Sequence, residues 1–182
     1  MSIQKSLKNR QVIHIQLIYI NYFIVKWDSL FPTINVEYIA GMPDVSFFDK
    51  IPKTSLIVFD DLWSEACKSP DIVKAFKVFS RKMEISMVII SQCYFGGGDG
   101  GREIRNNVDV IVLFENHGDA NLNTRIMRKL GYIQAYKQAV TNMRLNPYSY
   151  IVVNCSAKLS SNYLRVCSNL FCEKHPYIEF YV

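Results

Sequence analysis

Four largely apolar runs, in which Ser55 and Asp109 are the polar exceptions, constrain the fold of this chain more than any other feature. They cover residues 55–59, 87–90, 108–114 and 150–153. Strands that are apolar at every position, rather than at alternate positions, are typical of sheets covered on both faces. Helical patterns separate several of these runs, which implies crossover connections and parallel strands. The runs therefore predict an α/β fold built on a mostly parallel sheet.

The segments between the runs supply the helices and two further strands. Ile72, Ala75, Phe76 and Phe79 recur at helical spacing after Ser69, a good N-cap, and Pro70. A second helical pattern covers residues 121–144 and is expected to break at Gly131. Short strands are predicted over 34–39 and 177–182. Since no linker stands out, we expect one three-layer α/β domain over residues 1–182.

The N-terminal region resembles a signal anchor at first sight, because three basic residues precede an apolar run over 12–25. That run contains His14, Gln16 and Asn21, and it falls short of the ~18 apolar residues that a membrane helix needs. Alternation over residues 13–19 favours a strand. We therefore expect no membrane segment.

Polar residues follow two of the apolar runs directly. Asp60 and Asp61 end the first run, and Ser91 and Gln92 end the second. In open parallel sheets ligands bind beyond the carboxyl ends of the strands. One carboxylate could hold Mg²⁺ and the other could orient or deprotonate a water. The alternative is an aspartate that merely caps the following helix.

Three more residues are candidates for phosphate chemistry. The amide of Gln92 can bridge a phosphate oxygen and an attacking water, because it both donates and accepts. Arg102 and Arg105 follow a glycine-dense stretch, residues 96–101, which we interpret as a flexible connection. An arginine on such a loop could act in a neighbouring subunit's site. The alternative is that both arginines are solvated or paired with Glu103 and Asp109.

Taken in order, these features resemble the DNA-packaging ATPases of the FtsK–HerA class of P-loop motors. Poxviruses, other large DNA viruses and the Polinton/Maverick elements carry such proteins. The stretches that bear the resemblance are LIVFDDL (56–62), like the Walker B strand; FSRK (79–82) leading into SMVIISQ (86–92), like the sensor strand; REIRNN (102–107) running into VIVLFEN (110–116); and NPYSYIVV (146–153), like the last core strand.

The resemblance implies a role for each candidate residue. Asp60 would bind Mg²⁺, Asp61 would take the general-base position, where many relatives have glutamate, and Gln92 would be the sensor. Arg102 or Arg105 would be the arginine finger. The family further implies ATP as cofactor, a homo-oligomeric ring, double-stranded DNA, and capsid or portal proteins as partners.

The chain departs from this family in one large respect. It contains no GxxxxGK[ST] motif, the loop whose backbone and lysine hold the phosphates. We therefore interpret it as truncated at its N-terminus, with little or no ATPase activity alone. The 12–19 run is expected to substitute for the lost central strand, whose absence would expose unpaired edges on its neighbours.

The net charge and the cysteines are compatible with the resemblance to a DNA-packaging ATPase. A net charge of +5 suits an anionic partner but is mild. Five irregularly spaced cysteines argue against a disulfide framework and favour a reducing compartment. Together with this, the resemblance implies an intracellular location such as a virion, a viral factory or the host nucleus or cytoplasm. Two alternatives stay open: a non-catalytic binding or ring-subunit protein, and an unrelated α/β enzyme.

Overall fold

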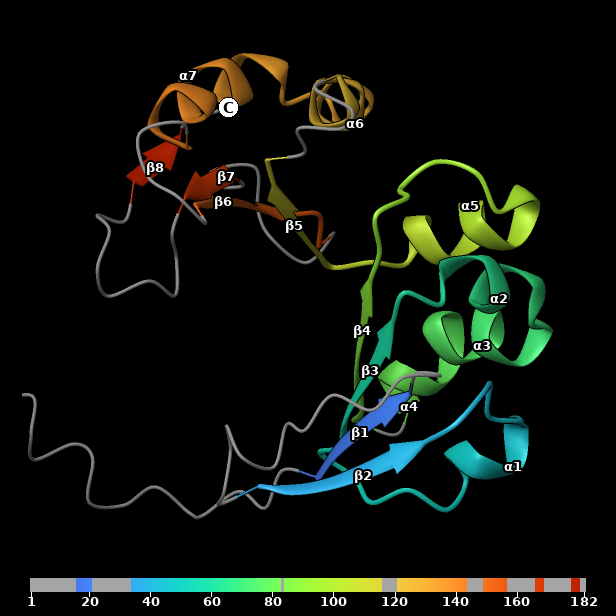
Figure 1. Ribbon diagram of the computed structural model, residues 1–182. Helices are drawn as coiled ribbons and strands as arrows, with labels where there is room; N and C mark the ends of the chain where they lie inside the picture. The colour runs from blue at the N-terminus through green and yellow to red at the C-terminus, as the bar shows by residue number, and fades with distance from the viewer. Residues whose placement is uncertain are drawn as a thin grey trace, which may run out of the picture. The chain divides into compact units, whose positions relative to one another are not determined.

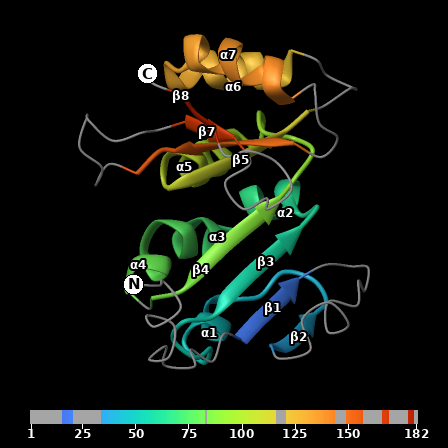
Figure 2. The same cartoon turned by 90° about the vertical axis from the view of Figure 1, so that its left-hand side faces the viewer.

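The computed structural model describes residues 16–20, 34–82, 84–115, 121–143, 149–156, 166–168 and 178–180. The chain divides into two compact units, Met1–Asn107 and Val108–Val182 (Figures 1 and 2). Each unit has its own sheet and helices and is described by itself. That the two units make one domain stays a prediction.

The first unit is built on a four-stranded parallel sheet. Its strand order is β2-β1-β3-β4, with β1 Gln16–Ile20, β2 Asn35–Ile39, β3 Leu56–Asp60 and β4 Ser86–Ile90. The strands predicted from the apolar runs over 55–59 and 87–90 and from residues 34–39 are confirmed. Ile57, Val58 and Phe59 of β3 are buried, as expected for a strand inside a covered sheet.

Strand β1 carries the N-terminal run into the interior of this sheet. It pairs with β2 on one side and β3 on the other, and Ile18 is fully buried. The expected strand is thus neither helical nor at an edge, although residues 12–15 lie outside the described residues. Whether it takes the place of a lost family strand stays a prediction.

Helices of the first unit gather on one face of the sheet (Figures 1 and 2). Ser69 caps the predicted helix by accepting a hydrogen bond from Ile72 N at 3.3 Å, and Pro70 is its first residue. Phe76 of this helix packs on Phe59 of β3, with ring centroids 6.2 Å apart. The helical segments are α1 Val45–Phe48, α2 Trp63–Lys68, α3 Pro70–Lys74, a π-helical segment η2 Ala75–Phe79, α4 Ser80–Lys82 and α5 Gly98–Asn106.

The glycine-dense stretch is not the flexible connection that we predicted. Gly97, with φ of 75°, caps the nine-residue helix α5, which contains three glycines. A Cβ on Gly100 would lie 2.0 Å from Cys67 O of α2, and one on Gly97 would lie 2.4 Å from Cys67 Sγ. The glycines therefore let α5 approach α2 closely. Arg102 and Arg105 consequently lie on a helix rather than on a loop.

The second unit differs from the expectation of one mostly parallel sheet. Its sheet, of order β5-β6-β7-β8, is antiparallel. The predicted break at Gly131 is confirmed, because this residue ends the first of two helices with φ of 85°. The protein is thus a mixed α/β protein, and the three-layer arrangement stays a prediction. The elements are β5 Val110–Phe114, α6 Leu122–Leu130, α7 Ile133–Met143, β6 Tyr150–Asn154, β7 Val166–Ser168 and β8 Ile178–Phe180.

Apolar side chains are exposed on one edge strand of each sheet. Strand β4 ends the order of the first sheet and β5 begins that of the second. Every large hydrophobic residue that is exposed among the described residues lies on these two strands: Val88, Ile90, Val110, Val112 and Phe114. Edges without charge or proline are open to pairing with another strand. Across the part of the chain that is described, no helix is long and apolar enough to cross a membrane.

Candidate functional site

The candidate site lies at the carboxyl ends of β3 and β4. These strands are parallel neighbours, and Asp60 pairs with Ile90 in their register. The ladder continues one residue further, since Asp61 N donates to Ile90 O at 2.9 Å. The backbone therefore brings Asp60, Asp61 and Gln92 to one edge of one sheet, where ligands of open parallel sheets bind.

Asp61 has a backbone conformation that few side chains adopt. Its φ is 55°, in the left-handed region. Aspartate and asparagine tolerate this region better than other non-glycine residues, and such strain gathers at functional sites. Phe59 and Leu62 are buried on either side of the aspartate pair, which anchors the turn. The turn presents Asp61 to solvent and leaves Asp60 half-buried.

A compact turn holds Gln92. Ser91 Oγ accepts a hydrogen bond from Cys93 N and donates one to Cys93 O, both at 2.9 Å. A serine that bonds the backbone two residues ahead fixes the intervening turn. Gln92 lies between these partners and is exposed. Its amide is therefore offered to solvent on a defined backbone.

The donor set at this edge suits a hard cation better than a soft one. Two carboxylates and an amide provide oxygen ligands, which Mg²⁺ prefers. Among the described residues, no three His, Cys, Asp or Glu side chains gather as a metal site. Mg²⁺ is commonly held by one or two carboxylates together with waters and substrate phosphates, so an all-protein cage is not required.

Arg102 and Arg105 are one helical turn apart on α5, but their surroundings differ. Arg102 pairs with Asp99, and the side chains of the pair are 66% and 87% exposed. Arg105 is half-buried and donates from Nη1 to Tyr94 O at 3.0 Å and to Gly96 O at 2.9 Å. The pairing with Glu103 that we considered for these arginines is not observed.

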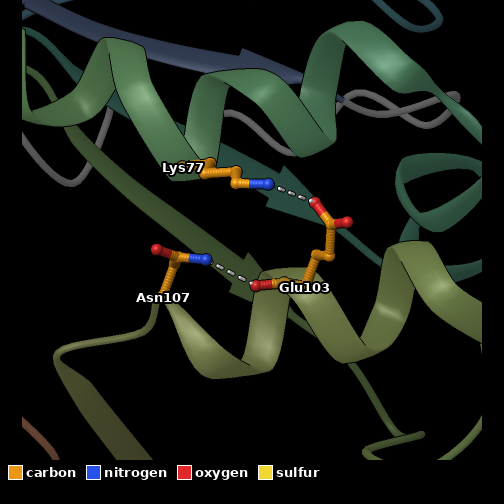
Figure 3. Close-up of polar contacts among 3 residues, drawn as sticks. All are labelled: Lys77, Glu103 and Asn107. Carbon is orange, nitrogen blue, oxygen red and sulfur yellow. Dashed lines mark hydrogen bonds and ion pairs between the residues drawn. The ribbon is translucent and has the colours of Figure 1, made fainter.

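Glu103 is instead engaged with the neighbouring helical segment. Its Oε2 forms an ion pair with Lys77 Nζ of η2 at 3.1 Å (Figure 3). Its backbone oxygen accepts a hydrogen bond from Asn107 Nδ2 at 2.8 Å. These contacts join the C-terminal half of α5 to η2. The helix that carries both arginines is therefore held at its packed face and at its end.

Two aromatic residues near the site escaped the sequence analysis. The guanidinium carbon of Arg105 lies 5.6 Å from the centroid of the Trp63 ring and 5.7 Å from that of the Tyr94 ring. Trp63 follows Asp61 by two residues, and Tyr94 follows Gln92 by two. No periodic pattern marks these two residues, because Trp63 begins a helix and Tyr94 lies in a loop.

The thiol of Cys67 lies beneath the same helix. Burial raises the pKa of Cys67, against the smaller effect of the Arg105 charge, which lowers it. A buried thiol with a raised pKa is a poor nucleophile. Cys67 and Cys93 are free thiols. Cys172 and the three histidines lie outside the described residues.

Comparisons with known proteins give one distant likeness. No protein-family model and no curated protein matches the sequence. Among solved structures, the chain is similar to that described as the crystal structure of B204, the DNA-packaging ATPase from Sulfolobus Turreted Icosahedral Virus. Sequence identity is 14% and the TM-score 0.49, over 77% of this chain and 78% of that one. At these values the function is argued from the residues alone.

Proposed function

We propose that this chain is the C-terminal part of a viral-type genome-packaging ATPase of the FtsK–HerA class, which couples ATP hydrolysis to translocation of double-stranded DNA. The observation that carries the proposal is the meeting of Asp60, Asp61 and Gln92 at the ends of two parallel strands. The order of the four motif stretches supports the class. No step of this argument uses the distant structural likeness.

Each residue at the sheet edge takes one part of the chemistry. Asp60, half-buried at the last position of β3, would hold Mg²⁺ on the β- and γ-phosphates of ATP. Asp61, exposed on its left-handed turn, would orient or deprotonate the attacking water. Gln92 would bridge that water and the γ-phosphate through its amide. The Mg²⁺ ion supplies charge neutralisation when it is bound.

The surroundings of the two arginines favour Arg102 over Arg105 as the arginine finger. Arg102 forms only an exposed ion pair with Asp99, and such pairs contribute little and exchange readily. Its guanidinium could therefore leave Asp99 for a phosphate in a neighbouring subunit. Arg105 already donates to two carbonyls of its own chain.

The glycines of residues 96–101 do not serve as the missing phosphate cradle in this proposal. Gly100 and Gly101 stand where a side chain would meet the backbone oxygens of Cys67 and Gly96, so their small size serves packing. No GxxxxGK[ST] motif is present in the 182 residues. Carboxylates without a cradle bind ATP poorly, and we propose that the chain alone has little or no ATPase activity.

The proposed partners follow from the family rather than from this chain. They are double-stranded DNA, further copies in a homo-oligomeric ring, and capsid or portal proteins. The net charge of +5 is compatible with DNA. The apolar edges of β4 and β5 favour a second candidate function, that of a non-catalytic protein that joins a ring of intact subunits.

An ATPase assay tests the proposed half-site. We expect the purified 182-residue chain with Mg²⁺ and ATP to release no more phosphate than its Asp61→Asn variant. Asparagine is the matched change, since it keeps the size and tolerates the left-handed backbone. ATP turnover that Asp61→Asn abolishes would contradict the predicted inactivity.

The nucleotide sequence upstream of the Met1 codon separates the two candidate functions. An in-frame GxxxxGK[ST] motif there supports the motor. A stop codon or unrelated sequence in its place favours the non-catalytic protein.

A further inference from the structure

Arg105 contacts both loops that carry the candidate site. We propose that Arg105 is a positioning residue that clamps the loop after β3 to the loop after β4. The clamp would hold the Asp60–Asp61 pair and Gln92 as one preformed unit. Only its effect on metal binding rests on the proposed function; the clamp itself does not.

The first half of the clamp is a pair of hydrogen bonds. Arg105 Nη1 donates to Tyr94 O at 3.0 Å and to Gly96 O at 2.9 Å. Both acceptors belong to the segment that follows Gln92, which carries no regular structure before α5 begins. Bonds from a charged donor are stronger than those between neutral groups. The guanidinium therefore fixes the backbone that leaves the sensor position.

The second half of the clamp is a pair of ring contacts. The guanidinium carbon lies 5.6 Å from the centroid of Trp63 and 5.7 Å from that of Tyr94. Both distances are within the reach of a cation–π interaction. Tyr94 belongs to the loop after β4, and Trp63 directly follows the loop after β3. Trp63 is the first residue of α2, so its position sets where the chain leaves the Asp61 turn.

Neighbouring residues make room for the clamp. A Cβ on Gly101 would lie 2.5 Å from Gly96 O and 3.2 Å from Arg105 Nη1. Glycine at this position therefore leaves the space in which these two atoms form their hydrogen bond. The close contacts of Gly97 and Gly100 with Cys67 pack the helix that carries Arg105 against α2, and a partly exposed ion pair of Glu103 with Lys77 adds a contact with η2 (Figure 3). Both the acceptor loop and the donor helix are thus fixed.

The cluster is not optimised for stability. Trp63 Nε1 and Arg105 Nε are buried without a hydrogen-bond partner in the described part of the chain. Unpaired buried donors are unfavourable, and apolar residues of similar size would avoid that penalty. The contacts of Arg105 with two rings and two backbone oxygens are better explained by the loop positions that they fix. Lysine would not replace it, because an ammonium has no planar fork to stack between rings.

Hydrogen exchange measures the clamp directly. We would compare the 182-residue wild type, Arg105→Lys, and Asn106→Ala as a control at an exposed position of the same helix. In Arg105→Lys we expect amide exchange to rise about tenfold in residues 61–64 and in residues 92–96 together, while the amides of β3 keep their protection. Asn106→Ala should change neither loop.

Binding of Mn²⁺, a paramagnetic substitute for Mg²⁺, shows whether the clamp serves the site. We expect Arg105→Lys to weaken Mn²⁺ binding about tenfold at a temperature where all three proteins are folded, because outer-shell partners position metal ligands. Asn106→Ala should bind as the wild type does. A purely structural role for Arg105 would lower the melting temperature and leave Mn²⁺ affinity unchanged, which would overturn the positioning role.

The two readouts also separate this inference from the proposed function. If the wild type binds no Mn²⁺ but Arg105→Lys loosens both loops, the clamp stands and the metal site fails. If Mn²⁺ binds and neither loop loosens, the clamp is overturned. Should Arg105→Lys fail to fold, guanidinium nitrogen spectra of the wild type decide. Restricted rotation at Arg105 supports the clamp, and free rotation overturns it.

Discussion

Replacing Gly100 by alanine sets two physical effects against each other. In an ordinary helix this change stabilises the protein by about 1 kcal/mol, because alanine is the better helix former. Gly100 of α5 is not in an ordinary place. A Cβ there would lie 2.0 Å from Cys67 O, a backbone atom of α2, and 3.2 Å from Val73 Cγ2. The structure therefore predicts that Gly100→Ala destabilises the protein.

The expected size of the loss follows from the atoms that would clash. Overpacking typically costs ~1–3 kcal/mol, and the upper end applies because a backbone oxygen cannot rotate away. After the gain in helix propensity is subtracted, we expect a net loss of about 2 kcal/mol in the free energy of unfolding. In a unit of this size such a loss lowers the melting temperature by roughly 8–16 °C.

Urea unfolding followed by circular dichroism measures this change. Asn106→Ala is the matched control, because Asn106 is exposed near the end of the same helix. It should leave stability unchanged or raise it slightly. If Gly100→Ala proves as stable as the wild type, then α5 does not pack closely on α2, and the explanation of the glycine stretch is wrong.

Three further predictions follow from the structure. Ser69→Ala should lower the free energy of unfolding by about 1 kcal/mol in the same urea assay, because it removes the N-cap bond to Ile72 N; no change would mean that the cap is not formed in solution. Iodoacetamide should alkylate exposed Cys93 well before buried Cys67, because burial blocks access and the raised pKa of Cys67 lowers its thiolate fraction at pH 8. Mass spectrometry of digests after short labelling measures both rates, and equal rates would contradict the burial of Cys67. The wild type should self-associate with rising concentration in sedimentation experiments, and Val88→Lys combined with Val112→Lys should reduce this association; a wild type that stays monomeric would contradict open edges on β4 and β5.

The sequence predicts local structure well where one residue type dominates the outcome. Largely apolar runs locate β3, β4, β5 and β6. Strands β3 and β6 are buried on both faces as expected, whereas β4 and β5 leave apolar side chains exposed on one face. Ser69 and Gly131 mark a helix start and a helix end, because a cap bond and a left-handed backbone are local requirements. The strand-end position of Asp60, Asp61 and Gln92 follows from the same runs.

Direction and packing were not predictable in the same way. Parallel strands need a long crossover, usually helical, but a helical connection does not by itself require the next strand to be parallel. Two helices, α6 and α7, separate β5 from β6, and these strands are antiparallel. The break at Gly131 was predicted, but a break between helices does not reveal the direction of the strand that follows. Glycine has a low helix propensity, so the glycines of α5 indicated a flexible segment. Close contact of α5 with Cys67 instead requires glycine at these positions.

The clamp residues were invisible for a similar reason. Trp63 and Tyr94 follow the site by two residues, but only the position of α5 brings Arg105 between them. Their side chains belong to loops and a helix start, where periodicity gives no information. The sequence could therefore identify the chemical groups at the sheet edge, while the parts that hold them in place required the tertiary structure.

Binding of Mn²⁺ at the edge of β3 and β4 is the most direct test of the central claim, that Asp60 and Asp61 form half of a magnesium–ATP site. We would follow paramagnetic broadening of amide signals as Mn²⁺ is added to the wild type, to Asp60→Asn and to Asp49→Asn, the last a control at an exposed carboxylate. The account predicts that Asp61 and Gln92 broaden first in the wild type and in Asp49→Asn, and that Asp60→Asn loses this selectivity. Broadening spread evenly over surface carboxylates, or retained in Asp60→Asn, would contradict it.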